Sequence, residues 1–330
     1  MNRSMARLAV FAALGIATVR YLPGRLPEPA DLLDAFRGAS PGWLVLAGAA
    51  QVVSMEMFSR QQLTLLRSYG VSLSPARSSA ITYARSTISM VLPAGSVVSA
   101  GFAFRQWRAR GATAPVAAAV MLLSGVLSFA GLITLYLVGS AIALALRPTA
   151  LPAEQLRILA VALLLRVVAA RAVHAWSARS RRHRPRVCRA VDRLRRATTD
   201  IVAAMSAVPR RHLLVALGFA AANWLADLTC LVGTARALHV RVDLAAVAGV
   251  YLLAQAVRQV PITPGGVGVI ETTLAAGLVT TGVAEVAAAA AVLGYRLLSC
   301  WLLVPVGAVS WATLRTAGRP GRAQPCRVGR

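Results

Sequence analysis

The sequence predicts an all-α fold, a polytopic membrane helical bundle with about eight spans. Of its 330 residues, 57% are hydrophobic and 14% are charged, and the mean hydropathy of +0.64 is well above that of globular proteins. The charges are also segregated, because residues 115–146 carry none whereas residues 179–196 are dense in Arg. Uncharged segments separated by basic clusters are typical of membrane spans and their cytoplasmic loops.

Eight apolar segments are candidate spans, because a helix needs about 20 apolar residues to cross the hydrocarbon core. They cover residues 8–22, 42–60, 79–92, 115–138, 156–175, 213–236, 244–260 and 284–313. The first resembles a signal peptide but no small-residue cleavage site follows it, so we interpret it as an uncleaved span. The segment 156–175 contains three Arg residues, and its assignment depends on the apolar core at 158–165.

The basic side chains are all Arg, and they give the chain a net charge of +25. They lie between apolar segments and not on a soluble face, which argues against a nucleic-acid partner. The positive-inside rule instead places four stretches in the cytoplasm, and with them both termini of a bacterial plasma-membrane protein. These stretches are Arg60–Arg77, Arg105–Arg110, 177–211 and 315–330. Basic loops beside a bilayer attract anionic lipid headgroups, which are therefore the partners that we expect.

The chain is predicted to consist of two similar transmembrane halves. The halves cover residues 1–176 and 212–314, and they are joined by an Arg-rich cytoplasmic loop at 177–211 and followed by a basic tail at 315–330. Each half contains a motif with a Pro-Gly break, near residues 93–125 in the first and near 264–296 in the second. At an offset of 171 positions, Pro93-Ala94-Gly95 aligns with Pro264-Gly265-Gly266, and Gly111 aligns with Gly282. This agreement predicts an internal repeat.

The charges suggest that the repeat is inverted. The segment after Pro93 ends in the basic stretch 105–110, whereas the equivalent stretch 276–281 is uncharged, so the two are expected on opposite faces of the membrane. Inverted repeats are common in transporters and place the substrate site near the bilayer midplane. In this arrangement Pro93 is reached from outside and Pro264 from inside, and the two broken elements approach each other within the membrane.

The break in the second half contains two prolines and three glycines between Pro261 and Gly268. These residues cannot continue a regular spanning helix. Thr263 is a suitable N-cap and Pro264 a favoured first residue, so we expect a new helix to begin there. A helix that ends near Thr281 is shorter than the hydrocarbon core. The sequence therefore predicts a half-span or re-entrant helix, with a counterpart in the first half.

The N-terminus of this short helix is a candidate anion site. Unpaired backbone N–H groups and partial positive charge suit a phospholipid phosphate. Gly265 and Gly266, which follow Pro264, would let the phosphate approach the backbone closely. The alternative is a simple interhelical turn in which the glycines serve packing.

Six ionisable residues lie in apolar segments, where charge is costly and usually faces a cavity or a partner. They are Glu56, Arg85, Asp227, Arg258, Glu271 and Arg296. Glu271 and Arg296 are placed to pair. The pair either holds two helices together, or Arg296 is a guanidinium fork for a lipid phosphate, with Glu271 holding Arg296 when no lipid is bound. Arg258 either joins this site or snorkels to the surface, and we interpret Asp227 as a hydrogen-bonding residue of helix packing. The candidate substrate-binding residues are Arg258, Pro264, Gly265, Gly266, Glu271 and Arg296.

No enzyme activity, metal or cofactor is predicted. The four His residues lie at span ends or in the basic loop without metal-ligand spacing, and the four Cys residues are far apart. The sequence contains no phosphate-binding loop, dinucleotide fingerprint or nucleophile elbow.

The run from Pro261 to Glu271, with Gly282-Val283 and the span around Arg296, resembles the C-terminal signature of the lysylphosphatidylglycerol synthase transmembrane-region family of flippase-like proteins. The segment Leu92–Gly95 resembles the weaker first motif of the family. The resemblance implies a bundle of about six to eight spans that handles lipids.

In the bifunctional members this region flips an aminoacylated phospholipid that a separate synthase domain makes. Other members accompany polyprenyl-lipid, glycolipid or hopanoid pathways. We expect no synthase domain after residue 315, and hence a stand-alone flippase-like unit that translocates or handles an anionic, aminoacylated or polyprenyl-linked lipid. The alternatives are a non-transporting scaffold for lipid or glycan biosynthesis enzymes and a membrane-embedded lipid-modifying enzyme. Ala100 and Gly125 occupy the positions equivalent to Glu271 and Arg296, so only the second half carries the charged pair.

Overall fold

A computed structural model describes residues 34, 36–92, 95–146, 188–241, 243–258 and 268–316. All regular elements in this part of the chain are helices. They are α3 (Pro41–Ser68), α4 (Pro75–Val91), α5 (Gly95–Arg108), α6 (Ala114–Leu146), α8 (Cys188–Ser206), α9 (Arg210–Ala237), α10 (Leu244–Arg258), α11 (Val269–Thr280), α12 (Glu285–Arg296), the π-helical turn η3 (Leu297–Trp301) and α13 (Leu303–Thr316).

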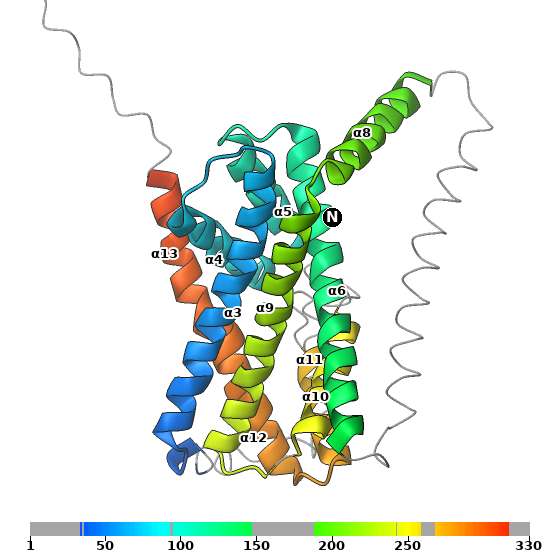
Figure 1. Ribbon diagram of the computed structural model, residues 1–330. Coiled ribbons are helices and arrows are strands. Elements are labelled where there is room, and N and C mark those ends of the chain that lie inside the picture. The colour runs from blue at the N-terminus through cyan, green and yellow to red at the C-terminus, as the bar shows by residue number, and fades with distance from the viewer. Residues whose placement is uncertain are drawn as a thin grey trace, which may run out of the picture.

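Four long elements run the full height of the bundle in Figure 1, namely α3, α6, α9 and the continuous run α12–η3–α13. Each is long and apolar enough to cross a membrane. Their positions confirm the spans that the sequence predicts at 42–60, 115–138, 213–236 and 284–313. The spans predicted at 8–22 and 156–175 lie outside the described residues.

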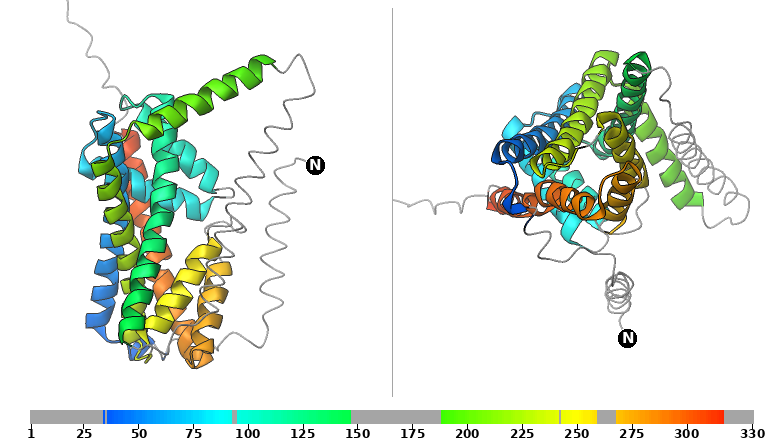
Figure 2. Two further views of the ribbon diagram at one scale, coloured as in Figure 1. Left: turned by 45° about the vertical axis from the view of Figure 1, so that its right-hand side comes forward. Right: turned by 90° about the horizontal axis from the view of Figure 1, so that it is seen from below.

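The helices α4, α5, α10 and α11 are short and form two hairpins. They have 17, 14, 15 and 12 residues, so the longest is about 26 Å at 1.5 Å per residue, less than the hydrocarbon thickness. The α4–α5 hairpin occupies the upper half of the bundle and the α10–α11 hairpin the lower half (Figures 1 and 2). The spans predicted at 79–92 and 244–260 are therefore wrong, because these segments are arms of half-height hairpins.

The proline at position 93 explains where α4 ends. The residue before a proline is disfavoured in the α-helical region, and Leu92 has an extended backbone with φ −94° and ψ 142°. Both outer ends of the α4–α5 hairpin lie at the upper end of the bundle, whereas those of α10–α11 lie at the lower end (Figure 1). The two hairpins therefore enter the bundle from opposite ends, whereas Pro93 and Pro264, predicted to be reached from outside and from inside, lie outside the described residues.

The upper end of the bundle carries most of the charge. The C-termini of α3, α5 and α13 and the N-termini of α4, α6 and α9 meet there (Figure 1). Its described basic residues include Arg67, Arg77, Arg105, Arg108, Arg110, Arg210, Arg211 and Arg315. At the lower end, Arg37, Arg236 and Arg241 are balanced by Asp34, Asp243 and Glu285. The described parts of the basic clusters that the sequence assigns to one side of the membrane thus share one end of the bundle.

Helix α8 leaves the bundle at this upper end and slants away from it (Figure 2). It belongs to the loop 177–211, and Tyr69, just after α3, connects to it by donating its hydroxyl to the carbonyl of Ala204 at 2.7 Å. Burial raises the pKa of Tyr69 above its ordinary value, so the phenol keeps its proton, and with it this bond, to a more alkaline pH than an exposed tyrosine would.

The pair α3 and α9 makes the most extensive interhelical contact of the bundle. A Cβ atom added at Gly233 of α9 would lie 3.2 Å from the Cβ of Ala47 on α3, so small residues bring the two backbones close, as is common in membrane bundles. Each hairpin packs on a long element of the other half, because α4 contacts α13 and α10 contacts α6.

The outer faces of the long helices are apolar. Large hydrophobic side chains are exposed on α3, α6, α9 and α13, whereas an isolated soluble protein rarely exposes so many together. They include Val45, Val52, Val53, Leu122, Val126, Leu137, Val138, Leu214, Val215, Leu225, Val306 and Val309. This distribution is that of a bundle whose surroundings are lipid.

Candidate functional site

The structure brings Glu271 and Arg296 together. Glu271 lies in the first turn of α11 and Arg296 is the last residue of α12. The Nε atom of Arg296 donates to Oε1 of Glu271 at 2.5 Å, and Arg296 is only 4% exposed. A charge-assisted hydrogen bond of this kind is among the stronger polar interactions in proteins.

The second carboxylate oxygen of Glu271 holds the start of α11. The backbone N–H of Gly268 donates to Oε2 at 2.7 Å, and Gly268 is the N-cap with φ +86°. Glycine adopts this conformation without a steric penalty, and such a residue cannot lie inside an α-helix. The start predicted at Pro264 is therefore wrong for α11, which begins at Val269.

The capping role of Glu271 was not anticipated from the sequence, although a Glu three positions after an N-cap is placed to accept from the N-cap N–H. Because Glu271 accepts from both Gly268 and Arg296, it couples the start of α11 to the end of α12. The carboxylate thus fixes the position of the guanidinium.

Arg296 retains donors for another ligand. A guanidinium has five N–H donors, and among the described residues the hydrogen bond to Glu271 uses only the one on Nε. The two terminal nitrogens are therefore the groups with which Arg296 would bind an anion.

The remaining candidate residues cannot be placed around this pair. Arg258 is the last residue of α10, but its side chain lies outside the described residues, as do Pro264, Gly265 and Gly266. A role for these four residues in substrate binding stays a prediction.

Asp227 of α9 is the centre of a second polar network. Its Oδ2 atom accepts hydrogen bonds from the hydroxyl of Tyr251 at 2.6 Å, from the hydroxyl of Tyr295 at 2.8 Å and from Nε2 of Gln255 at 3.2 Å. Tyr251 and Gln255 lie on α10, and Tyr295 precedes Arg296 on α12. The packing role that we inferred for Asp227 is confirmed, because this carboxylate connects three helices.

A simpler contact occupies the equivalent place in the first half. Glu56 of α3 precedes Asp227 by 171 positions, the offset of the predicted repeat, and its Oε2 accepts a hydrogen bond from the hydroxyl of Ser79 on α4 at 2.9 Å. Each carboxylate thus connects a long helix to the hairpin that follows it. Comparing the two halves at this offset would have revealed the pair from the sequence.

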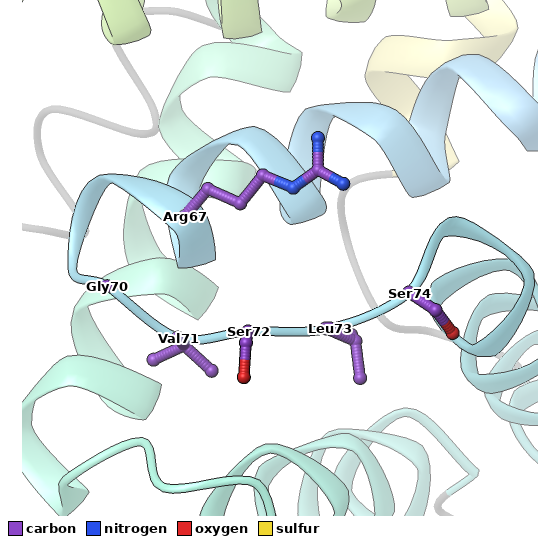
Figure 3. Close-up of a pocket in the computed structure, with 6 residues that line it drawn as sticks. All are labelled: Arg67, Gly70, Val71, Ser72, Leu73 and Ser74. Atoms are coloured by element: carbon purple, nitrogen blue, oxygen red, sulfur yellow. The ribbon is translucent and has the colours of Figure 1, made fainter.

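A shallow surface hollow of about 580 Å³ lies at the Arg-rich end, beside the loop between α3 and α4. In Figure 3 the side chain of Arg67 extends on one side of the loop, whereas Val71, Ser72 and Leu73 point to the other. The polar groups do not converge, and the hollow is lined by none of the candidate residues. Among the described residues, no cluster of His, Cys, Asp and Glu is arranged to hold a metal ion.

Comparison with known proteins gives a match over most of the chain. The family model of the lysylphosphatidylglycerol synthase TM region matches residues 5–307. The matched range includes both hairpins, Asp227, Glu271 and Arg296. No curated protein matches the sequence.

Proposed function

This chain belongs to the lysylphosphatidylglycerol synthase TM region family, an integral membrane domain of flippase-like proteins, and we propose that it moves a lipid with an anionic headgroup between leaflets. The observation that carries the proposal is the buried Arg296, held by Glu271 where the α10–α11 hairpin meets a long element. A charged residue within a membrane bundle is expensive and is usually functional.

The pair suits a lipid phosphate because of its hydrogen-bonding geometry. A guanidinium recognises phosphate through two parallel N–H donors. Glu271 uses only the Nε donor of Arg296, so the two terminal nitrogens are available for this contact. Glu271 neutralises Arg296 through Nε, so a phosphate can bind the two terminal nitrogens while this ion pair remains in place. Glu271 then keeps its bond to the N–H of Gly268, so the start of α11 remains capped while the lipid is bound.

The helix boundaries support an inverted repeat as the basis of transport. The first residues of α3 and α9, α4 and α10, α5 and α11, and α6 and α12 differ by 169, 169, 174 and 171 positions. The hairpins enter from opposite ends of the bundle (Figure 1), and each packs on a long element of the other half. Such a pair of elements can open one side of the membrane at a time.

The orientation follows from the charges. If the Arg-rich end is cytoplasmic, as the positive-inside rule requires, α4–α5 enters from the cytoplasm and α10–α11 from the outer face. Arginines at the cytoplasmic end would attract anionic headgroups, and Arg296 would hold one within the membrane.

Flipping of a fluorescent anionic phospholipid by purified protein in proteoliposomes tests the proposal. We expect Arg296→Gln to reduce the protein-dependent rate at least about tenfold, which corresponds to the loss of about 1.4 kcal/mol of binding in the rate-limiting state. The matched control is Arg37→Gln, because Arg37 pairs with Asp34 at the exposed lower end, and it should leave the rate unchanged.

Two outcomes would overturn the proposal. Flipping at the wild-type rate by both Arg296→Gln and Glu271→Gln would show that the pair has no role in transport. No flipping by the wild-type protein, together with stable co-purification of a lipid or glycan biosynthesis enzyme, would favour the scaffold function.

A further inference from the structure

The two carboxylate oxygens of Asp227 accept different numbers of hydrogen bonds. Three donors converge on Oδ2, from Tyr251, Tyr295 and Gln255, whereas no hydrogen bond joins Oδ1 to a described residue. Asp227 is 6% exposed and lies among the apolar residues of the core between α9, α10 and α12. The distribution of donors leaves Oδ1 as the place for a further ligand.

Gln255 supplies the second observation. Its side chain is 2% exposed, and its Nε2 donates to Asp227, but its Oε1 atom is buried with no partner among the described residues. A buried acceptor without a donor destabilises the folded protein. The amide cannot reverse to solve this, because its oxygen would then face a carboxylate oxygen.

A proton on Asp227 would satisfy both atoms. A carboxylic acid and a primary amide pair through two hydrogen bonds, one from the amide N–H to the acid carbonyl and one from the acid O–H to the amide oxygen. The first is present between Nε2 of Gln255 and Oδ2 of Asp227. The second needs one proton on Oδ1, which would be donated to Oε1 of Gln255.

We propose that Asp227 is a proton-binding site of the membrane domain, with the proton shared between its Oδ1 atom and Oε1 of Gln255. The proton comes from water and no other bond is made or broken. When it is bound, α10 is held to α9 by a neutral acid–amide pair. When it leaves, Oε1 of Gln255 is again buried without a donor, which weakens the contact between α10 and α9.

Among the described side chains, no cation beside Asp227 is left to replace this proton. Arg296 follows Tyr295 but is neutralised by Glu271, and Arg258 lies one helical turn after Gln255, at the end of α10. If Arg258 were the counterion, Asp227 would remain ionised, and the experiment below would detect it. The titratable and charged groups on α9 and on the elements packed against it include Cys230 on α9, Glu56 on α3, Tyr136 on α6, Tyr251 and Arg258 on α10, Tyr295 and Arg296 on α12, and Cys300 on η3.

The site is placed to couple protonation to lipid binding, and this part of the inference rests on the proposed function. Tyr295 contacts Asp227 and the adjacent Arg296 contacts Glu271. A change at Asp227 therefore reaches the guanidinium through consecutive residues of α12. No nucleotide-binding motif is present in the sequence, so a proton gradient is a suitable energy source.

Infrared difference spectroscopy of the full-length protein in detergent tests the proton site without transport. The spectrum at acidic minus alkaline pH should contain the carbonyl band of a protonated carboxylic acid in an apolar environment, and the band should shift in D₂O. We expect Asp227→Asn to abolish this band and Gln255→Leu to shift it. The matched control Glu56→Gln removes the equivalent carboxylate of the first half and should leave the band in place.

Persistence of the band in Asp227→Asn, or its absence from the wild-type protein, would overturn the inference. Because Asn is almost isosteric with Asp, and Gln255→Leu keeps the carboxyl group, at least one variant should remain folded. A band assigned to Asp227 in a protein that flips no lipid would support the proton site and overturn the proposed function. Lipid flipping by a wild-type protein that lacks this band would support the proposed function and overturn the proton site.

Discussion

Glu271 determines how much the buried charge of Arg296 costs the folded protein. Removing one partner of a buried ion pair leaves an uncompensated charge and typically costs about 3–5 kcal/mol. Glu271→Ala also removes the acceptor for the N–H of Gly268. We therefore expect this variant to lower the free energy of unfolding in detergent by about 3–5 kcal/mol, as measured by chemical denaturation.

A double-mutant cycle separates the ion pair from the cap. Glu271→Gln keeps an oxygen for Gly268 and should be less harmful than Glu271→Ala. Combined with Arg296→Met, which removes the guanidinium, it leaves no unpaired charge, so the double variant should be more stable than the sum of the two single changes predicts. Additive losses would mean that the 2.5 Å contact contributes nothing to stability.

The sequence was sufficient to predict this pair but not the network of Asp227. A Pro-Gly break fixes a short helix that carries Glu271, and Arg296 falls in the next span, 25 residues later. The donors to Asp227 come from positions 24, 28 and 68 residues away. Which of many polar residues in apolar helices meet depends on how the helices pack and turn, and periodicity alone does not determine that.

At the level of elements, the contact between α4 and α13 depends on a glycine. A Cβ atom added at Gly307 would lie 2.5 Å from the backbone carbonyl of Tyr83 and would also meet Thr87. A backbone carbonyl cannot move aside as a side chain can, so Gly307→Val should push α4 away from α13. We expect a loss of about 1–3 kcal/mol in the free energy of unfolding, measured by denaturation in detergent.

Gly218 of α9 is the matched control. A Cβ atom at this position meets nothing within 4 Å, so Gly218→Ala should be neutral or should stabilise the helix by up to about 1 kcal/mol. Equal losses in the two variants would contradict a specific role for the α4–α13 contact.

The long elements could be predicted from the sequence, and the hairpins only in part. A run such as 115–138 is long, uncharged and apolar, and both its type and its position were correct. The segments 79–92 and 244–260 are also apolar, but their lengths alone do not distinguish a short span from a re-entrant arm. Their depth is determined by which long element each arm packs against, α13 for α4 and α6 for α10.

At the level of the whole molecule, the structure and the charges together give a topology that labelling can test. The loop between α3 and α4 contains the exposed Ser72 at the Arg-rich end, and the loop between α11 and α12 contains the exposed Ala284 at the other. Leu92, at the tip of the α4–α5 hairpin, is separated from both ends because α4 and α5 occupy only the upper half (Figure 1).

Single cysteines at these three positions, in a protein whose four native cysteines have been replaced, should react differently with a membrane-impermeant thiol reagent. In intact cells Ala284→Cys should be labelled, whereas Ser72→Cys should be labelled only after the membrane is permeabilised, because the positive-inside rule places the arginines in the cytoplasm. Leu92→Cys should not be labelled from outside, since a half-height hairpin does not reach the outer surface. Labelling of Leu92→Cys in intact cells as fast as Ala284→Cys would mean that α4 and α5 each cross the membrane, which would contradict a half-height α4–α5 hairpin.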